Sequence, residues 1–123
     1  LAFAVGDAVT VGDLTLTVGA PKNRKPGEFD SPKSGNFAVF PVTVTNNGTD
    51  LAYASSGDFG LYVNDTKIDE AYIAGIDFVI DDIAPGKTVN GELAFDLKKG
   101  SRFEVIYTPS FVADQQIRFT GSN

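Results

Sequence analysis

The chain has 123 residues, a formal net charge of −6 and no Cys, His, Met or Trp. This length fits a single domain over residues 1–123, and a hydrophobic fraction of 42% can fill a core. The acidic balance excludes nucleic acid as a partner, because phosphate contacts need clustered Lys and Arg. Without His and Cys there is no Ser-His-Asp or Cys-His catalytic group and no ordinary zinc or copper site.

The beginning of the chain predicts strands. The first residues, LAFAVGDAV, lack the basic region and the long apolar run of an intact signal peptide. No apolar run approaches the roughly 18 residues of a membrane helix. Val9 and Val11, and then Leu14, Leu16 and Val18, alternate with polar residues. This period of two predicts two short strands, or one strand that bends between them.

A long polar loop is expected over Pro21–Asn36. It carries three prolines and the basic residues Lys22, Arg24, Lys25 and Lys33. A loop of this length in a compact domain is either functional or mobile. Its basic side chains are those of an ordinary solvated loop, or they contact anionic polymers such as teichoic acids or lipid headgroups.

The stretch FAVFPVTVTNN predicts a half-buried strand that ends at an Asn-Asn-Gly turn. Phe37 and Val39 fall on the opposite phase from Phe40 and the valines after it. Pro41 cannot donate a hydrogen bond to a neighbouring strand, which places it at a sheet edge or a bulge. A β-bulge at residues 39–41 would explain both the proline and the change of phase.

The middle of the chain is strongly acidic. DFGLYVNDTKI predicts a hairpin that turns at Asn64–Asp65. In the next stretch, DEAYIAGIDFVIDDI, acids and alanines allow a short helical turn, whereas Gly75 and the β-branched residues disfavour a long helix. From Asp50 to Asp82 eight acidic residues accompany one base, Lys67, so this block carries the whole negative balance.

The stretch IAPGKTVNGELAF contains Gly86-Lys87-Thr88, the end of a phosphate-binding loop motif. The full motif G-x-x-x-x-G-K-[ST] requires Gly at position 81, where this chain has Asp81. The residues that follow Thr88 favour a strand over a helix. We therefore interpret Pro85 and Gly86 as a turn that leads into a strand, and RFEVIYT and QQIRFT as two further strands.

Short strands and frequent turns, with hardly any helix, predict an all-β fold. Seven to nine strands fit an antiparallel β-sandwich, and a small barrel is the alternative. The connections are too short for crossover helices, which argues against a parallel sheet.

Carboxylates are the remaining candidates for chemistry. Calcium takes hard oxygen ligands, and end loops of a sandwich can supply them without a fixed motif. The candidate ligands lie in the acidic segment 64–82, alongside Glu70: Asp65, Asp69, Asp77, Asp81 and Asp82. The opposing interpretation is a solvated acidic face. Glycoside hydrolysis would need two carboxylates about 5–10 Å apart in a cleft, and four tyrosines are the only partial substitutes for a Trp sugar platform.

The order of VGDAVTVGDLTLTV, FAVFPVTVTNNGTD, IAPGKTVNGELAFDL and RFEVIYTP…QQIRFT resembles the domain of unknown function 4352 family. The resemblance runs from Val5 to Thr120, and it includes Asn46 at the end of a strand and a Gly-x-Leu-x-Phe strand at Gly91–Phe95. The family occurs in bacterial secreted proteins and lipoproteins. It implies an immunoglobulin-like β-sandwich similar to a mycobacterial immunoprotective extracellular antigen, and it supplies no catalytic residue.

The resemblance implies an extracellular or cell-surface location. Family members commonly begin with a lipid-attachment Cys, which this chain lacks. We expect a non-enzymatic module without a cofactor that binds a protein or cell-envelope partner through a sheet edge or end loops, Pro21–Asn36 and the segment 64–82 foremost. The alternative is a calcium- or carbohydrate-binding module that uses the acidic segment 64–82.

Overall fold

The computed structural model describes residues 2–25, 34–71, 73, 75–77, 80–109 and 115–123. One turn of 3₁₀ helix, η1, lies at Ser56–Asp58. The strands in these residues are β1 (Ala2–Ala4), β2 (Ala8–Val11), β3 (Leu14–Val18), β4 (Lys22–Arg24), β5 (Phe37–Asn46), β6 (Ala52–Ser55), β7 (Phe59–Val63), β8 (Thr66–Ile68), β9 (Ile80–Ile83), β10 (Thr88–Asp96), β11 (Arg102–Tyr107) and β12 (Ile117–Ser122).

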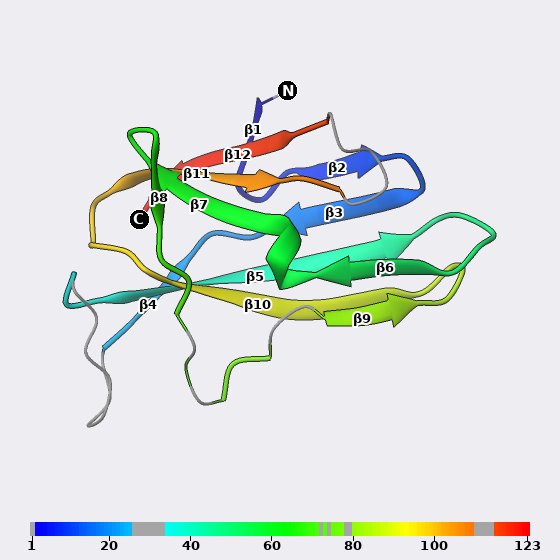
Figure 1. The fold of residues 1–123 in the computed structure, drawn as a ribbon, viewed down its shortest axis with the longest axis horizontal. Helices are drawn as coiled ribbons and strands as arrows, with labels where there is room; N and C mark the ends of the chain where they lie inside the picture. Colours follow the sequence, from blue (N-terminus) through cyan, green and yellow to red (C-terminus); the bar gives the residue numbers. More distant parts are fainter. Residues whose placement is uncertain (1, 26–33, 72, 74, 78–79, 110–114) are drawn as a thin grey trace.

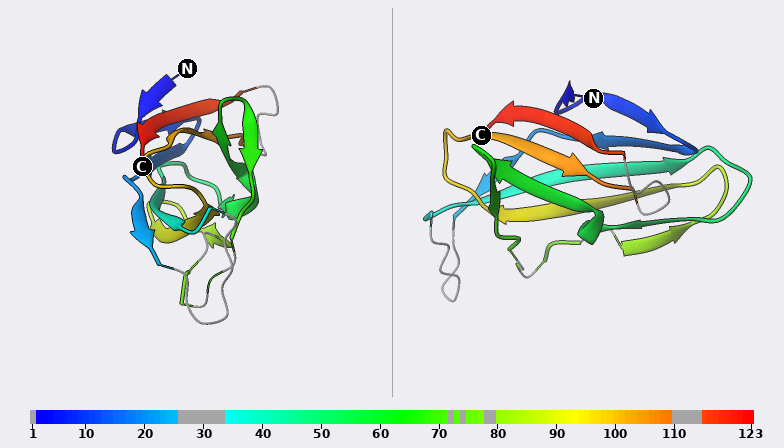
Figure 2. Two further views of the ribbon diagram at one scale, coloured as in Figure 1. Left: turned by 90° about the vertical axis from the view of Figure 1, so that its left-hand side faces the viewer. Right: turned by 45° about the horizontal axis from the view of Figure 1, so that its top comes forward.

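The strands form two five-stranded sheets and a two-stranded ribbon. One sheet has the order β1-β12-β11-β7-β8, and we call it sheet A. Sheet B has the order β10-β5-β3-β2, with β4 paired to the first part of β5. Strands β6 and β9 form the ribbon. Sheets A and B face each other as two layers (Figures 1 and 2), so the expected all-β sandwich is confirmed.

Residues that alternate along the strands fill the space between the sheets. Phe40 of sheet B is fully buried, and its ring packs edge-on against Phe103 of sheet A at 5.0 Å between ring centroids. Phe95 approaches Phe40 in the same way at 6.0 Å. Truncating a buried Phe to Ala typically costs about 3–5 kcal/mol, so this trio is a main source of stability.

Strand β5 has no bulge, so the expectation of one at residues 39–41 is wrong. Its register with β10 is unbroken from Phe37 to Thr45. The extra residue lies on the other side: three residues separate Val18 from Lys22, whereas two separate their partners Val42 and Val39. The Pro41 carbonyl accepts a hydrogen bond there from Gly19 N (2.7 Å). The nitrogen of Pro41 therefore faces the side on which the chain between β3 and β4 has its extra residue. The regular pairing is interrupted there, so the missing N–H of the proline costs no hydrogen bond between strands.

The change of phase in β5 has a different cause. Phe37 and Val39 face away from the main core and pack in a second small apolar cluster with Ala71 and Ile73. Both faces of β5 are therefore buried at its beginning, and the apolar residues there need not alternate.

The segment after β8 covers the outer edge of β10. Ala71 N donates to Ala94 O (2.8 Å), and Glu92 N donates to Asp77 O (2.7 Å). Within the described part of residues 69–83 there is no helical turn, and residues 80–83 form β9. Covering an edge in this way satisfies its backbone groups and prevents pairing with another chain.

Two connections complete sheet A. The β7–β8 hairpin turns at Asn64 and Asp65, both with positive φ (48° and 66°), as a two-residue type I′ turn requires, and this confirms the expected hairpin. Strand β1 pairs in parallel with β12, so the first and the last strand of the chain are neighbours in sheet A (Figure 1). In the described residues no helix has the length and apolar character needed to span a membrane.

Candidate functional site

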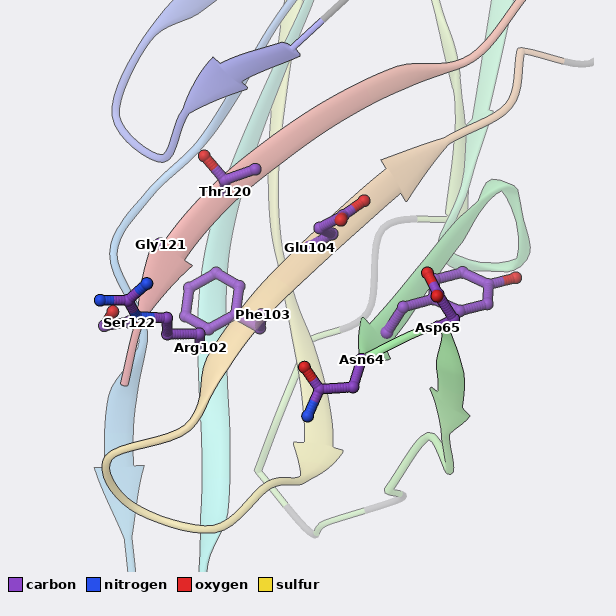
Figure 3. A pocket seen from close by; sticks show the side chains of 9 residues that line it. Asn64, Asp65, Arg102, Phe103, Glu104, Thr120, Gly121 and Ser122 are labelled. Atoms are coloured by element: carbon purple, nitrogen blue, oxygen red, sulfur yellow. The ribbon is translucent and has the colours of Figure 1, made fainter.

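A hollow lies on the outer face of sheet A, next to the β7–β8 hairpin (Figure 3). Its cavity volume is about 530 Å³, within the range of about 300–1,000 Å³ that is common for small-molecule sites. It is lined by Tyr62, Asn64, Asp65, Arg102, Phe103, Glu104, Thr120, Gly121 and Ser122. The lining is thus mostly polar and comes from three segments that are distant in sequence, residues 62–65, 102–104 and 120–122.

The lengths of the strands create this hollow. Strand β11 pairs with β12 over residues 102–107, but it pairs with β7 only over residues 104–107. The chain of β7 turns away at Asn64 while β11 continues to Arg102. The sheet is therefore narrower at this end, and the hairpin stands as a wall beside Arg102 and Glu104 (Figure 3).

A second hollow of about 280 Å³ adjoins the first, and Tyr62 lines both. Gly60, two residues earlier on β7, also lines the second hollow. A Cβ atom at Gly60 would lie 3.2 Å from Cε1 of Tyr62 and 3.7 Å from Cε of Lys67. The absence of a side chain at Gly60 therefore lets the half-buried Tyr62 ring and the Lys67 stem lie low over the sheet. We call the two hollows, with Tyr62 between them, the groove.

Charged groups of both signs border the groove. Glu104 and Arg118 face each other at 4.0 Å with 41% and 51% of their side chains exposed. An ion pair this exposed contributes little to folding stability. Asp65 and Arg102 are exposed and line the first hollow. These groups can exchange water for a ligand at low cost to the fold.

Asp58 lines the second hollow and is half-buried. Burial raises the pKa of its carboxyl, opposed by a hydrogen bond from the backbone of Ser55. Tyr107 is buried beneath, with its ring 4.8 Å from that of Phe59. Burial, and then the charge of Asp58, raises the pKa of Tyr107 to about 12. The neutral phenol is therefore part of the core.

The acidic residues expected as calcium ligands are spread over several elements. Asp65 is at the hairpin turn, and Asp69 lines a separate hollow with Ser34 and Asp96. Asp77 accepts the backbone hydrogen bond of Glu92 described above. Asp81 and Asp82 are exposed on β9, where Asp82 pairs with Tyr53 of β6.

No three residues of the types His, Cys, Asp and Glu gather as a metal-binding group in the part of the chain that the structure describes. Glu70 forms an isolated bridge with Phe95 of β10. Calcium binding by the acidic segment stays a prediction. It is tested by calcium titration in a calorimeter, where an absence of heat would end it.

The base of the loop Pro21–Asn36 is well anchored. Strand β4 pairs with β5, and Asn36, which is buried, donates from Nδ2 to Asn23 Oδ1 (2.8 Å) and to Leu97 O (3.0 Å). Ser34 Oγ donates to the carboxylate of Asp96. Lys33 and the rest of residues 26–33 lie outside the described residues, so the expected role of the loop stays a prediction.

Gly86-Lys87-Thr88 forms a turn and the beginning of β10, as expected. Gly86 N donates to Asn46 O (2.8 Å) and Lys87 N donates to Ala84 O (3.0 Å). Gly86 has φ of 76°, which favours glycine. These backbone donors serve the fold, whereas a phosphate-binding loop would point them at its ligand.

The sequence interpretation did not find the groove. Tyr62, Glu104 and Thr120 occupy outward positions of three strands, and they become neighbours only through the pairing β7-β11-β12. The signal was present as polar residues in alternation with buried ones on β11 and β12. Locating the groove also requires the order of the strands, which the pattern alone does not give.

Known proteins place this chain in a family. The model of the domain of unknown function DUF4352 matches residues 3–117. The lipoprotein YcdA of Bacillus subtilis (strain 168), whose name states that it is uncharacterized, is 32% identical over 112 residues, which are 88% of this chain and 30% of that protein. The chain thus spans about a third of this curated relative.

Solved structures show the same architecture. The crystal structure of YcdA has a TM-score of 0.75 at 26% identity and covers 94% of this chain, which in turn covers 38% of the YcdA chain. The yjhA protein of Bacillus subtilis has a TM-score of 0.77 at 19% identity, over 95% of this chain and 99% of its own. MPT63, a secreted protein of Mycobacterium tuberculosis, has a TM-score of 0.73 at 16% identity, over 98% and 97%.

The likeness to MPT63 confirms the expected sandwich, and the relatives comprise bacterial lipoproteins and a secreted protein whose names state no catalytic activity. The chain belongs to the family of the domain of unknown function DUF4352.

Proposed function

We propose that this chain is a non-catalytic binding domain at the bacterial cell surface, and that it holds an envelope component in the groove on sheet A. The observation that carries this proposal is the groove itself. Two hollows share Tyr62, and their lining comes mainly from strands β7, β11 and β12 together with the β7–β8 turn, Lys67 of β8 and η1. Relatives that are lipoproteins or secreted proteins support a location on the outer side of the cell membrane.

The chemistry of the groove favours binding over catalysis. A sequence without His and Cys leaves carboxylates as the usual groups for acid–base chemistry. A hydrolase of this type needs two carboxylates that face each other across the scissile bond. In the groove Glu104 faces the Arg118 guanidinium, and Asp65 projects from the hairpin (Figure 3).

The sheet face replaces the end loops as the preferred surface. Loop binding remains an alternative for Pro21–Asn36, whose basic residues would attract an anionic partner. The groove is favoured because it combines a defined hollow shape with exposed polar groups on paired strands.

Sedimentation with purified bacterial envelopes tests the proposal. Tyr62→Ala removes the ring between the two hollows, and Tyr53→Ala removes a tyrosine that is 48% exposed on β6. We expect the wild-type domain and Tyr53→Ala to sediment with envelopes and Tyr62→Ala to stay in solution. Equal sedimentation of both variants would contradict the groove as the binding surface.

A further inference from the structure

We propose that the groove binds a neutral oligosaccharide. One sugar ring would lie against Tyr62, and the adjoining sugar units would lie in the two hollows on either side of it. This inference rests on the proposed function and names the class of ligand for that surface. Three properties of the groove carry it: the placement of an aromatic ring, the balance of charge, and the supply of hydrogen-bonding groups.

The aromatic ring comes first. Tyr62 lies over Gly60, and the Lys67 stem lies beside the same glycine. The ring is half-buried, so it presents a low apolar surface to solvent between two polar hollows. A sugar ring has an apolar face of C–H groups and a rim of hydroxyls, which matches an aromatic ring bordered by polar groups.

Charge selects against an ionic polymer. Three acids, Asp58, Asp65 and Glu104, and two bases, Lys67 and Arg102, line the hollows. Arg118, which lies outside the lining and 4.0 Å from Glu104, supplies a third base, so the charges of the groove and its border balance. The whole chain has a net charge of −6, so its excess acidity lies elsewhere. A balanced surface does not attract a polyanion or a polycation over distance.

The hydrogen-bonding groups fit hydroxyls. Carboxylates only accept and guanidinium groups only donate, and the groove offers both beside the amide of Asn64 and the hydroxyl of Thr120. A sugar hydroxyl both donates and accepts, so a row of hydroxyls can satisfy this mixed lining without a net charge. Figure 3 shows Glu104 and Thr120 side by side on β11 and β12, and Arg102 at the end of the hollow.

The shape of the groove determines how long a ligand it holds and how strongly it binds that ligand. The two hollows have cavity volumes of about 530 and 280 Å³ and share Tyr62, so the ligand spans more than one sugar unit. The groove is open along the sheet and encloses little of its ligand. We therefore expect weak binding of a single chain, in the millimolar range, which several copies on one surface would strengthen.

Calorimetric titration with neutral tetrasaccharides of glucose and of N-acetylglucosamine tests the inference. We expect at least one of the two to bind, with affinity that changes less than about twofold between low and high salt, since a neutral ligand is not screened. Tyr62→Ala should weaken binding about tenfold, and Tyr53→Ala should leave it unchanged. Arg102→Ala serves as a second groove variant at an exposed position, with a loss of about threefold or more.

The outcomes separate the ligand class from the function. If neither sugar binds, yet envelopes retain the wild type and not Tyr62→Ala, the sugar inference is overturned and the binding module stands. Binding of poly(glycerol phosphate) that falls steeply with salt, in place of sugar binding, would also overturn it in favour of an anionic polymer. If envelopes retain Tyr62→Ala as well as they retain the wild type, the proposed function is contradicted instead.

Discussion

Asn46 at the end of β5 is fully buried, whereas Arg102, Glu104 and Tyr62 of the groove border solvent. The Asn46 side chain donates to Asp50 O (2.8 Å) and Ile83 O (2.9 Å) and accepts from Gly48 N (2.9 Å). Its groups are used inside the protein, and they join the β5–β6 loop to the end of β9. The groove groups keep most of their hydrogen-bonding capacity facing water.

This difference separates two uses of polar residues. A buried amide with three partners stabilises one arrangement of loops, because leaving any partner unpaired is costly. Exposed groups on a sheet contribute little to folding stability, so they can be substituted to suit a ligand without loss of the fold. Asn46 therefore specifies the arrangement of the loops, whereas the groove is the surface to which we assign binding in the proposed function.

The largest expected effect concerns Asn46. We call Asn46 and its three backbone partners, the carbonyls of Asp50 and Ile83 and the N–H of Gly48, the corner. Asn46→Ala leaves these three groups without their partner, so we expect a loss of about 3 kcal/mol in the free energy of unfolding. Urea denaturation measures it. Asn47→Ala is the matched control, because Asn47 is exposed and makes one side-chain bond, to Thr15 Oγ1 (2.7 Å). Equal losses in the two variants would show that the corner is not special.

Tyr107 tests whether the layer beneath the groove is as firmly built as the corner. Its pKa is raised to about 12 from an ordinary value of 10.0, so its contribution to stability is complete below pH 10 and is lost as the pH rises from 10 to 12. The full loss is about 2–3 kcal/mol. Absorbance titration of tyrosinate should show a step near pH 12 that Tyr107→Phe removes. A Tyr107 that ionises near pH 10 would contradict this account.

The hairpin wall of the groove should gain stability from glycine. Asp65 has φ of 66°, a backbone conformation that costs an ordinary side chain free energy and costs glycine none. Asp65→Gly also produces the preferred Asn-Gly sequence of a type I′ turn. We expect a gain of about 0.5–1 kcal/mol in urea denaturation. A loss instead would indicate that the Asp65 carboxylate supports the turn.

The smallest effect on stability is expected inside the groove. Arg102→Ala replaces an exposed side chain, so the free energy of unfolding should stay within about 0.5 kcal/mol. The same variant should lose affinity for envelopes. A large loss of stability would mean that the groove is part of the structural framework, and the distinction from Asn46 would fail.

The sequence predicted most of the architecture and little of the groove. Alternation along residues 9–18 and 103–107, and the Asn64–Asp65 turn, follow local rules that the fold obeys. Asn46 was visible as a strand end before a turn, because two of its partners, Gly48 and Asp50, lie within four residues, whereas its bond to Ile83 was not visible. The groove depends on which strands become neighbours, and no local pattern states that β7 pairs with β11.

The errors at β5 have the same origin. Phe37 and Val39 look like a change of phase when β5 is considered alone. They are buried because a segment more than thirty residues later, with Ala71 and Ile73, covers that face. The bulge was placed on the strand that contains Pro41, whereas the extra residue belongs to its partner between Val18 and Lys22.

Amide NMR of the labelled domain during addition of solubilised envelope fragments compares all candidate surfaces at once. The account predicts shift changes that gather at Tyr62, Glu104 and Thr120, on three adjacent strands of sheet A. Changes that gather instead at Asp81 and Asp82 of β9, or at the base of the Pro21–Asn36 loop, would contradict the assignment of binding to the groove.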